Sequence, residues 1–173
     1  WKVPDQYSLA RFEQMHPRGP DVAPRFVFFP TITTHLPFNP VPPYQPEWAR
    51  VLTAQPFDAA DVQRALGEAV NWLDMFPDYL RMIDYNYRWL GGLMRLHEPR
   101  DTIYVLVGDH QPAANITGEG ASWDVPVHIV SRDVELLARF GAMGFHTGLE
   151  PPRKPLGALH DLTAMLLGAF AAD

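Results

Sequence analysis

The 173-residue sequence has no cysteine, which excludes disulfides, thiolate nucleophiles and cysteine-based zinc or iron–sulfur sites. It also has no basic excess, because 20 Asp and Glu outnumber 14 Lys and Arg and the formal net charge is −6. A nucleic-acid-binding surface would need such an excess or a basic stripe. The longest mostly apolar run, residues 162–172, is well short of the roughly 20 residues that a membrane helix needs. We therefore expect no nucleic-acid partner and no membrane span in this chain.

Several catalytic signatures are missing as well. The sequence contains no Gly-rich phosphate loop, no Gly-x-Ser-x-Gly elbow and no His-Glu-x-x-His helix. Thr31, Thr33 and Thr34 lie close to His35, but nothing in the pattern marks any of them as an activated nucleophile. The sequence thus offers no identifiable nucleophile.

Proline, in contrast, is abundant, with 18 residues, or about twice the usual ~5%. Ten of them fall between Pro17 and Pro56, so residues 1–57 are predicted to be a Pro-rich strand and loop region. Within it, the apolar run RFVFF at 25–29 is typical of a buried strand. The chain length predicts about one domain, which we expect to span 1–173.

Residues 58–173 have the pattern of an α/β region. Asp58 is a plausible helix N-cap, and Pro77 interrupts the following helix or starts a second one that runs to about Glu98. That second helix is indicated by apolar residues at helical spacing, namely Tyr79, Leu80, Ile83, Tyr87, Leu90 and Met94. Strands are predicted at 102–107 and 125–131, and helices at 133–140 and 157–171. This order predicts a layered, mostly parallel sheet with helices on both faces.

Asp109 and His110 directly follow the most strongly predicted strand, in TIYVLVGDHQP at 102–112. Ligands of open α/β sheets bind outside the carboxyl ends of the strands. A carboxylate oxygen and an imidazole nitrogen suit Zn²⁺ or Mn²⁺ better than Mg²⁺. An ordinary turn explains the same residues, with Asp109 capping backbone amides and His110 partly exposed. Spacing alone leaves both interpretations open.

His35 is a second candidate, at the end of FVFFPTITTH. If the two strands run parallel in one sheet, His35 reaches the same edge as Asp109 and His110. It would there bind an anionic group or donate a proton to a leaving oxygen. The alternative is a solvated loop histidine beside Pro37.

Taken together, these motifs resemble one superfamily. The strand ending in Gly108-Asp109-His110, the upstream Thr34-His35-x-Pro37 and a Tyr-x-x-x-Ile-x-Tyr helix at 79–85 are similar to the C-terminal half of sulfatase-like proteins in the alkaline phosphatase superfamily. That branch includes sulfatases, phosphoglycerol transferases and phosphoethanolamine transferases. The similarity extends from Phe26 to the C-terminus. GDHQP followed by DVPVHIVSRD looks particularly like bacterial sulfatase-like hydrolases that an N-terminal membrane region anchors.

The resemblance implies an alkaline-phosphatase-like fold and a hydrolase or transferase acting on phosphate or sulfate esters. Asp109 and His110 would bind a divalent metal (Mn, Zn, Mg or Ca), and His35 would contact the substrate or leaving group. The nucleophile would lie in the N-terminal half of a parent chain. The start at Trp1, without Met, agrees with a piece of a longer, extracytoplasmic polypeptide. This segment alone would then be inactive.

One departure argues against one subgroup. Phosphoethanolamine transferases carry a further His about a dozen residues after the Asp-His pair, where this chain reads GASWDVP. A second function class also stays open, namely a non-catalytic α/β binding or interaction module with the same fold. The upstream sequence would separate the two, because only the enzyme needs a Thr, Ser or Cys nucleophile after a strand there.

Overall fold

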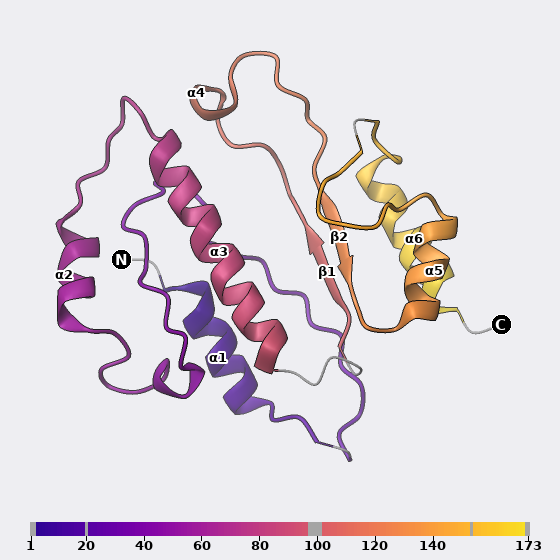
Figure 1. Cartoon of the computed structure of the whole chain (residues 1–173), viewed down its shortest axis with the longest axis horizontal. Coiled ribbons are helices and arrows are strands. Elements are labelled where there is room, and N and C mark those ends of the chain that lie inside the picture. Colours follow the sequence, from indigo (N-terminus) through magenta and orange to yellow (C-terminus); the bar gives the residue numbers. More distant parts are fainter. Residues whose placement is uncertain (1–2, 20, 97–101, 153, 172–173) are drawn as a thin grey trace. The chain divides into compact units, whose positions relative to one another are not determined.

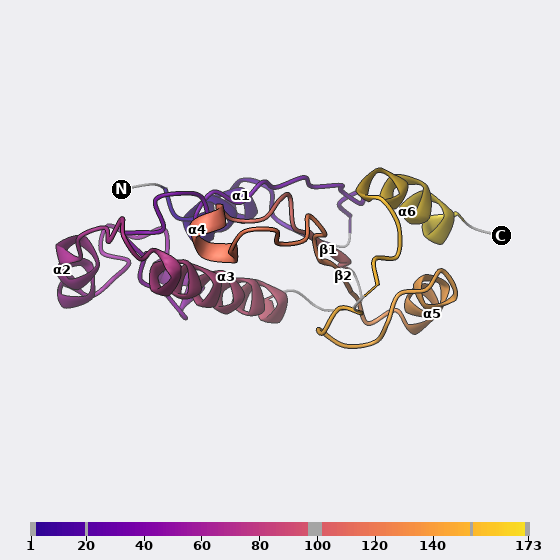
Figure 2. The same ribbon diagram turned by 90° about the horizontal axis from the view of Figure 1, so that it is seen from above.

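The computed structural model describes residues 3–19, 21–96, 102–152 and 154–171, and the ribbon is shown in Figures 1 and 2. The chain divides into two compact units, Trp1–Leu96 and His97–Asp173. The first contains α1 (Asp5–Met15), the short 3-10 helix η1 (Trp48–Arg50), α2 (Ala59–Gly67) and α3 (Phe76–Leu96). The second contains β1 (Tyr104–Val107), α4 (Ala114–Thr117), β2 (Val127–Val130), α5 (Val134–Ala142), η2 (Leu159–Asp161) and α6 (Leu162–Phe170).

α3 is the longest helix of the first unit and buries one face. It begins one residue before Pro77, whose missing N–H costs nothing in a first helical turn. Its buried apolar residues are Met82, Tyr85, Trp89 and Leu93, at the three- and four-residue spacing of one helix face. The other buried apolar residues of this unit are Leu9, Ala10, Phe38, Val51, Ala65 and Met75.

Buried polar side chains connect α1 to the Pro-rich loops. The Asp5 carboxylate accepts hydrogen bonds from the backbone N–H groups of Ile32 (3.0 Å) and Thr33 (2.9 Å). Gln6 donates to the carbonyl of Gln45 (2.6 Å) and accepts from the N–H of Gln45 (3.1 Å). These side chains satisfy backbone groups that neither helix nor strand pairs.

The second unit is built on an antiparallel pair of strands. Tyr104 pairs with Val130 and Val107 with Val127. A small apolar cluster of Leu136, Phe140 and Ala169 joins α5 to α6, and the partly buried Ile129, Met143, Phe145 and Leu166 pack against it. Asp133 caps α5 by accepting from the N–H groups of Glu135 and Leu136.

The predicted layered, mostly parallel sheet with helices on both faces is wrong. The described residues form a sheet of only two strands, and these run antiparallel, so the alkaline-phosphatase-like fold is absent. A parallel pair needs a crossover that returns the chain to its starting edge, usually through a helix. Between β1 and β2 the chain instead reverses, and the only helix in that connection, α4, has 4 residues.

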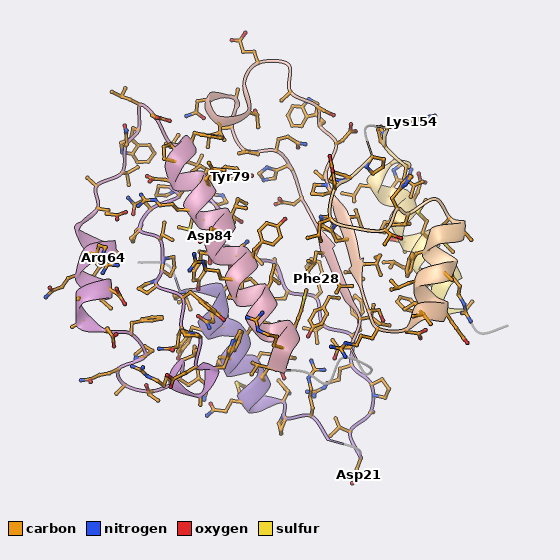
Figure 3. All side chains as sticks on the ribbon, viewed as in Figure 1. Asp21, Phe28, Arg64, Tyr79, Asp84 and Lys154 are labelled. Carbon is orange, nitrogen blue, oxygen red and sulfur yellow. The ribbon has the colours of Figure 1, made fainter. Side chains whose placement is uncertain are left out.

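The strand expected at 25–29 is likewise not formed. These residues form no strand with any described segment, and Phe26 and Phe28 are 92% and 82% exposed. Phe28, a residue of the first unit, is labelled in Figure 3. A β-prone composition creates a strand only where a neighbouring strand completes its hydrogen bonds.

Of the helices in the described part of the chain, none combines the length and apolarity needed to cross a membrane. The expectation of no membrane span is confirmed for those residues.

Candidate functional site

The Asp109–His110 pair lies where β1 ends and the connection to β2 begins. The N–H of Gly108 still donates to the carbonyl of Pro126 (3.0 Å), so the two strands stay close up to this point. A Cβ on Gly108 would lie 3.1 Å from Cδ of Pro126 and 3.2 Å from Cβ of Val125. A side chain at Gly108 would thus require Pro126 or Val125 to shift by a few tenths of an ångström, because the two segments approach closely next to the pair.

The contacts of His110 determine which ring nitrogen carries a proton. Nδ1 lies 2.7 Å from the carbonyl oxygen of Gln111, and because a carbonyl can only accept, Nδ1 must donate. In the neutral ring the lone pair is then on Nε2. Nε2 lies 3.4 Å from Oδ2 of Asp109, while Oδ1 of Asp109 accepts from the backbone N–H of His110 (2.9 Å).

This arrangement fits two ligands of one metal ion. Metal-bound histidines commonly donate their second ring nitrogen to a carbonyl, which sets the tautomer. Two ligand atoms about 2.1 Å from a tetrahedral ion lie about 3.4 Å apart, which is the spacing of Nε2 and Oδ2 here. If the ring is protonated, the same contact is an ion pair.

The pair is open to solvent and supplies two ligands. The side chains of Asp109 and His110 are 87% and 65% exposed. Over the described ranges, no cluster of three or more His, Asp or Glu side chains could hold a metal ion. Within those ranges, no third His, Asp or Glu side chain completes the pair.

His35 belongs to the first unit and ends a turn. Its N–H donates to the carbonyl of Ile32 (3.1 Å), and its Nδ1 lies 2.8 Å from the carbonyl of Leu36. Asp5 holds the start of this turn through the N–H groups of Ile32 and Thr33. The side chain of His35 is exposed. Its expected proximity to the Asp109–His110 pair, which is in the second unit, stays a prediction.

The structure draws attention to two residues that the sequence patterns do not single out. Asp5 positions the His35 turn, and the carbonyl of Asp124 accepts from the side chain of Gln111, next to His110. Asp5 sits at the start of a helix with weak apolar periodicity, and Asp124 is in a loop without a motif. Only the strand pairing, which continues to the bond between Gly108 and Pro126, could have pointed to Asp124.

Comparison with known proteins adds no assignment to this geometry. No protein-family model, no curated protein and no solved structure matches the chain.

Proposed function

We propose that this chain contributes an Asp-His metal-ligand pair to a divalent-metal-dependent hydrolase or transferase of phosphate or sulfate esters, similar to the sulfatase-like proteins. Asp109 and His110 bind the metal, and His35 contacts the substrate. The nucleophile and the remaining ligands come from the N-terminal half of a longer, extracytoplasmic parent chain. The proposal rests on these residues, and the overall fold gives it no support.

The observation that supports it is the orientation of His110. The Nδ1–H···O=C bond to Gln111 leaves Nε2 as the ligand atom, 3.4 Å from Oδ2 of Asp109. His160 and Asp161 also lie 3.4 Å apart, but among the described residues no backbone carbonyl accepts from the His160 ring, whereas Gln111 accepts from that of His110. That second pair provides a natural control.

The chemistry follows from the ligand types. A divalent ion held by the pair would act as a Lewis acid on an ester oxygen and would stabilise negative charge there. His35 would hold an oxygen of the substrate or donate a proton to the leaving group. Among the three threonines near His35, Thr33 is buried and its Oγ1 accepts from the N–H of Asp5 (3.2 Å). Thr33 is therefore not placed to attack an ester.

Exposed apolar side chains favour the presence of a further segment or protein that covers them. The apolar side chains of Phe26 and Phe28 are 92% and 82% exposed. Surface of this kind is normally covered by another segment or protein, as the proposal of an N-terminal half requires.

The first test is metal binding and turnover by the 173-residue chain. We expect weak Mn²⁺ binding in electron paramagnetic resonance titrations. His110→Ala and Asp109→Ala should remove it, whereas His160→Ala should not. Mn²⁺ binding that survives in both Asp109→Ala and His110→Ala would contradict the proposal.

The same chain should not turn over aryl phosphates or aryl sulfates with added Mn²⁺ or Zn²⁺. A catalytic zinc site usually has three protein ligands, whereas this proposal has two in Asp109 and His110, and the sequence has no identifiable nucleophile. Turnover that Asp109→Ala abolishes would show that a nucleophile lies within this chain, and Thr31 and Thr34 would be the first residues to replace.

The exposed Phe26 and Phe28 also favour a second candidate, an interaction module without chemistry. The sequence upstream in the parent reading frame decides between the two. A Thr, Ser or Cys after a strand, with an Asp or Glu some tens of residues earlier, would support the enzyme.

A further inference from the structure

A small cavity of the first unit lies beside the turn that carries His35. Four prolines and Met82 form its apolar walls, and Thr33 and Asn39 are the polar residues that line it. Its volume is about 20 Å³. A polar cavity of about 10–15 Å³ or more can hold one water molecule. The space therefore suits about one water molecule.

Asn39 presents an unpaired acceptor. Its side-chain Nδ2 donates to the carbonyls of Glu68 (3.4 Å) and Ala69 (3.3 Å), and because a carbonyl can only accept, these bonds fix which end of the amide is the oxygen. Asn39 is 4% exposed, and its Oδ1 is buried without a hydrogen-bond partner among the described residues. A buried acceptor of this kind is destabilising unless a donor reaches it.

Thr33 presents the matching donor. It is 2% exposed, and its Oγ1 accepts from the N–H of Asp5 (3.2 Å). A hydroxyl also has one O–H to donate. In the described part of the chain, no acceptor takes that O–H.

The two groups have complementary requirements. An occupant that satisfies both must accept from the Thr33 hydroxyl and donate to Oδ1 of Asn39. Water does both. An anion cannot donate to Oδ1, and a hard metal ion needs more oxygen ligands than these two side chains supply.

We propose that one water molecule binds in this cavity and bridges Thr33 Oγ1 to Asn39 Oδ1. Thr33 precedes His35 by two residues, and Asn39 follows it by four. The water therefore connects the two sides of the segment that carries His35, and it extends the polar support that Asp5 gives to the turn. This inference is independent of the proposed metal pair, because every residue in it belongs to the first unit.

The first experiment is a crystal structure of the unmodified chain at a resolution that shows ordered water. We expect one water oxygen within about 2.5–3.0 Å of both Thr33 Oγ1 and Asn39 Oδ1. A direct hydrogen bond between the two side chains, a water bound to only one of them, or a metal ion in the cavity would overturn the inference.

The second experiment counts long-lived water molecules in solution by oxygen-17 relaxation dispersion, which does not detect exchange of the Thr33 hydroxyl proton. Thr33→Val should have one long-lived water fewer than the wild type. Thr33→Ser, which keeps the hydroxyl, should retain that water, as should the control Thr31→Val at an exposed position.

Equal counts in the wild type and Thr33→Val, or the same loss in Thr33→Ser as in Thr33→Val, would overturn the inference. If Thr33→Val does not fold, the crystal structure of the unmodified chain decides. None of these variants changes Asp109 or His110, so the Mn²⁺ titrations test the proposed function separately.

Discussion

The two units of this chain satisfy their backbone hydrogen-bonding groups in different ways. In the first, Pro-rich loops have few ladder bonds, and buried side chains such as Asp5 and Gln6 satisfy the backbone groups. In the second, a strand pair satisfies its own backbone, and an apolar cluster around Phe140 holds the two helices. Proline lacks an N–H and fixes its φ angle, so a Pro-rich unit depends on side chains where the other depends on regular structure.

The two units are therefore expected to lose stability in different ways when a buried side chain is removed. Removing one buried polar side chain leaves backbone N–H groups without partners in a dry environment. Removing one apolar side chain leaves a cavity. The candidate residues are divided in the same way, because His35 depends on the polar anchoring of the first unit and His110 on the strand pair of the second.

The largest expected effect is that of Trp89→Ala. Trp89 is buried in α3, and its loss should lower the free energy of unfolding of the first unit by about 3–5 kcal/mol. Urea unfolding followed by amide hydrogen exchange should show lost protection in α3 and retained protection in β1 and β2. Trp72→Ala, at an exposed position, should change the free energy by about 0.5 kcal/mol or less. An equal loss of protection in both units would show that they unfold together.

Asp5→Ala is expected to have the next largest effect. It leaves the buried N–H groups of Ile32 and Thr33 without their acceptor, which should cost about 1–3 kcal/mol. Urea unfolding gives the free energy, and exchange of those two amides reports on the His35 turn. The control is Asp84→Ala, because Asp84 (labelled in Figure 3) forms an exposed ion pair with Arg88 at 2.7 Å. Removing the Asp84 ion pair should lower the free energy of unfolding by under about 1 kcal/mol. A larger loss of stability in Asp84→Ala than in Asp5→Ala would contradict the role of Asp5 as a buried hydrogen-bond acceptor.

Asp133→Ala tests helix capping in the second unit. Asp133 accepts from two N–H groups at the start of α5, so its removal should cost about 1 kcal/mol in thermal or urea unfolding. Asp58 occupies the N-cap position of α2 without a side-chain cap bond. Asp58→Ala should therefore lower the free energy of unfolding by only a few tenths of a kcal/mol. If the two variants lose the same stability, the cap bond of Asp133 contributes nothing.

The smallest effect at neutral pH is that of Tyr85→Phe, which concerns alkaline stability. Burial raises the pKa of Tyr85 above its ordinary 10.0, and the Asp5 carboxylate raises this pKa further. Because the phenol ionises more readily in the unfolded chain, its contribution to stability is present below pH about 10 and is lost as the pH rises above that value. Urea midpoints measured between pH 8 and 12 should fall in the wild type and fall less in Tyr85→Phe. The exposed Tyr87 provides the control, and an identical fall in Tyr85→Phe would refute the assignment.

Local signals predicted much of the secondary structure. Pro77 at the start of α3, Asp133 before α5 and the apolar runs that became β1 and β2 are all readable from neighbours in sequence. The helical period also predicted α3, but it did not identify the buried face. Leu80 and Tyr87 are exposed, while Met82 and Trp89 are buried, because α3 carries apolar residues on two faces and only packing chooses between them.

The sequence by itself determined that Asp109 and His110 follow a strand and that the chain lacks a thiol and an identifiable nucleophile. Tertiary structure alone decided the direction of strand pairing, the absence of a strand partner for 25–29 among the described residues and the bond between the Gln111 side chain and the carbonyl of Asp124. The physical reason is that the composition of a segment indicates its β propensity and which side chains share a face. Its backbone hydrogen bonds depend instead on which segment lies beside it in the folded chain. The segments 25–29 (RFVFF) and 104–107 (YVLV) are both β-prone, but among the described residues only 104–107 pairs with another strand.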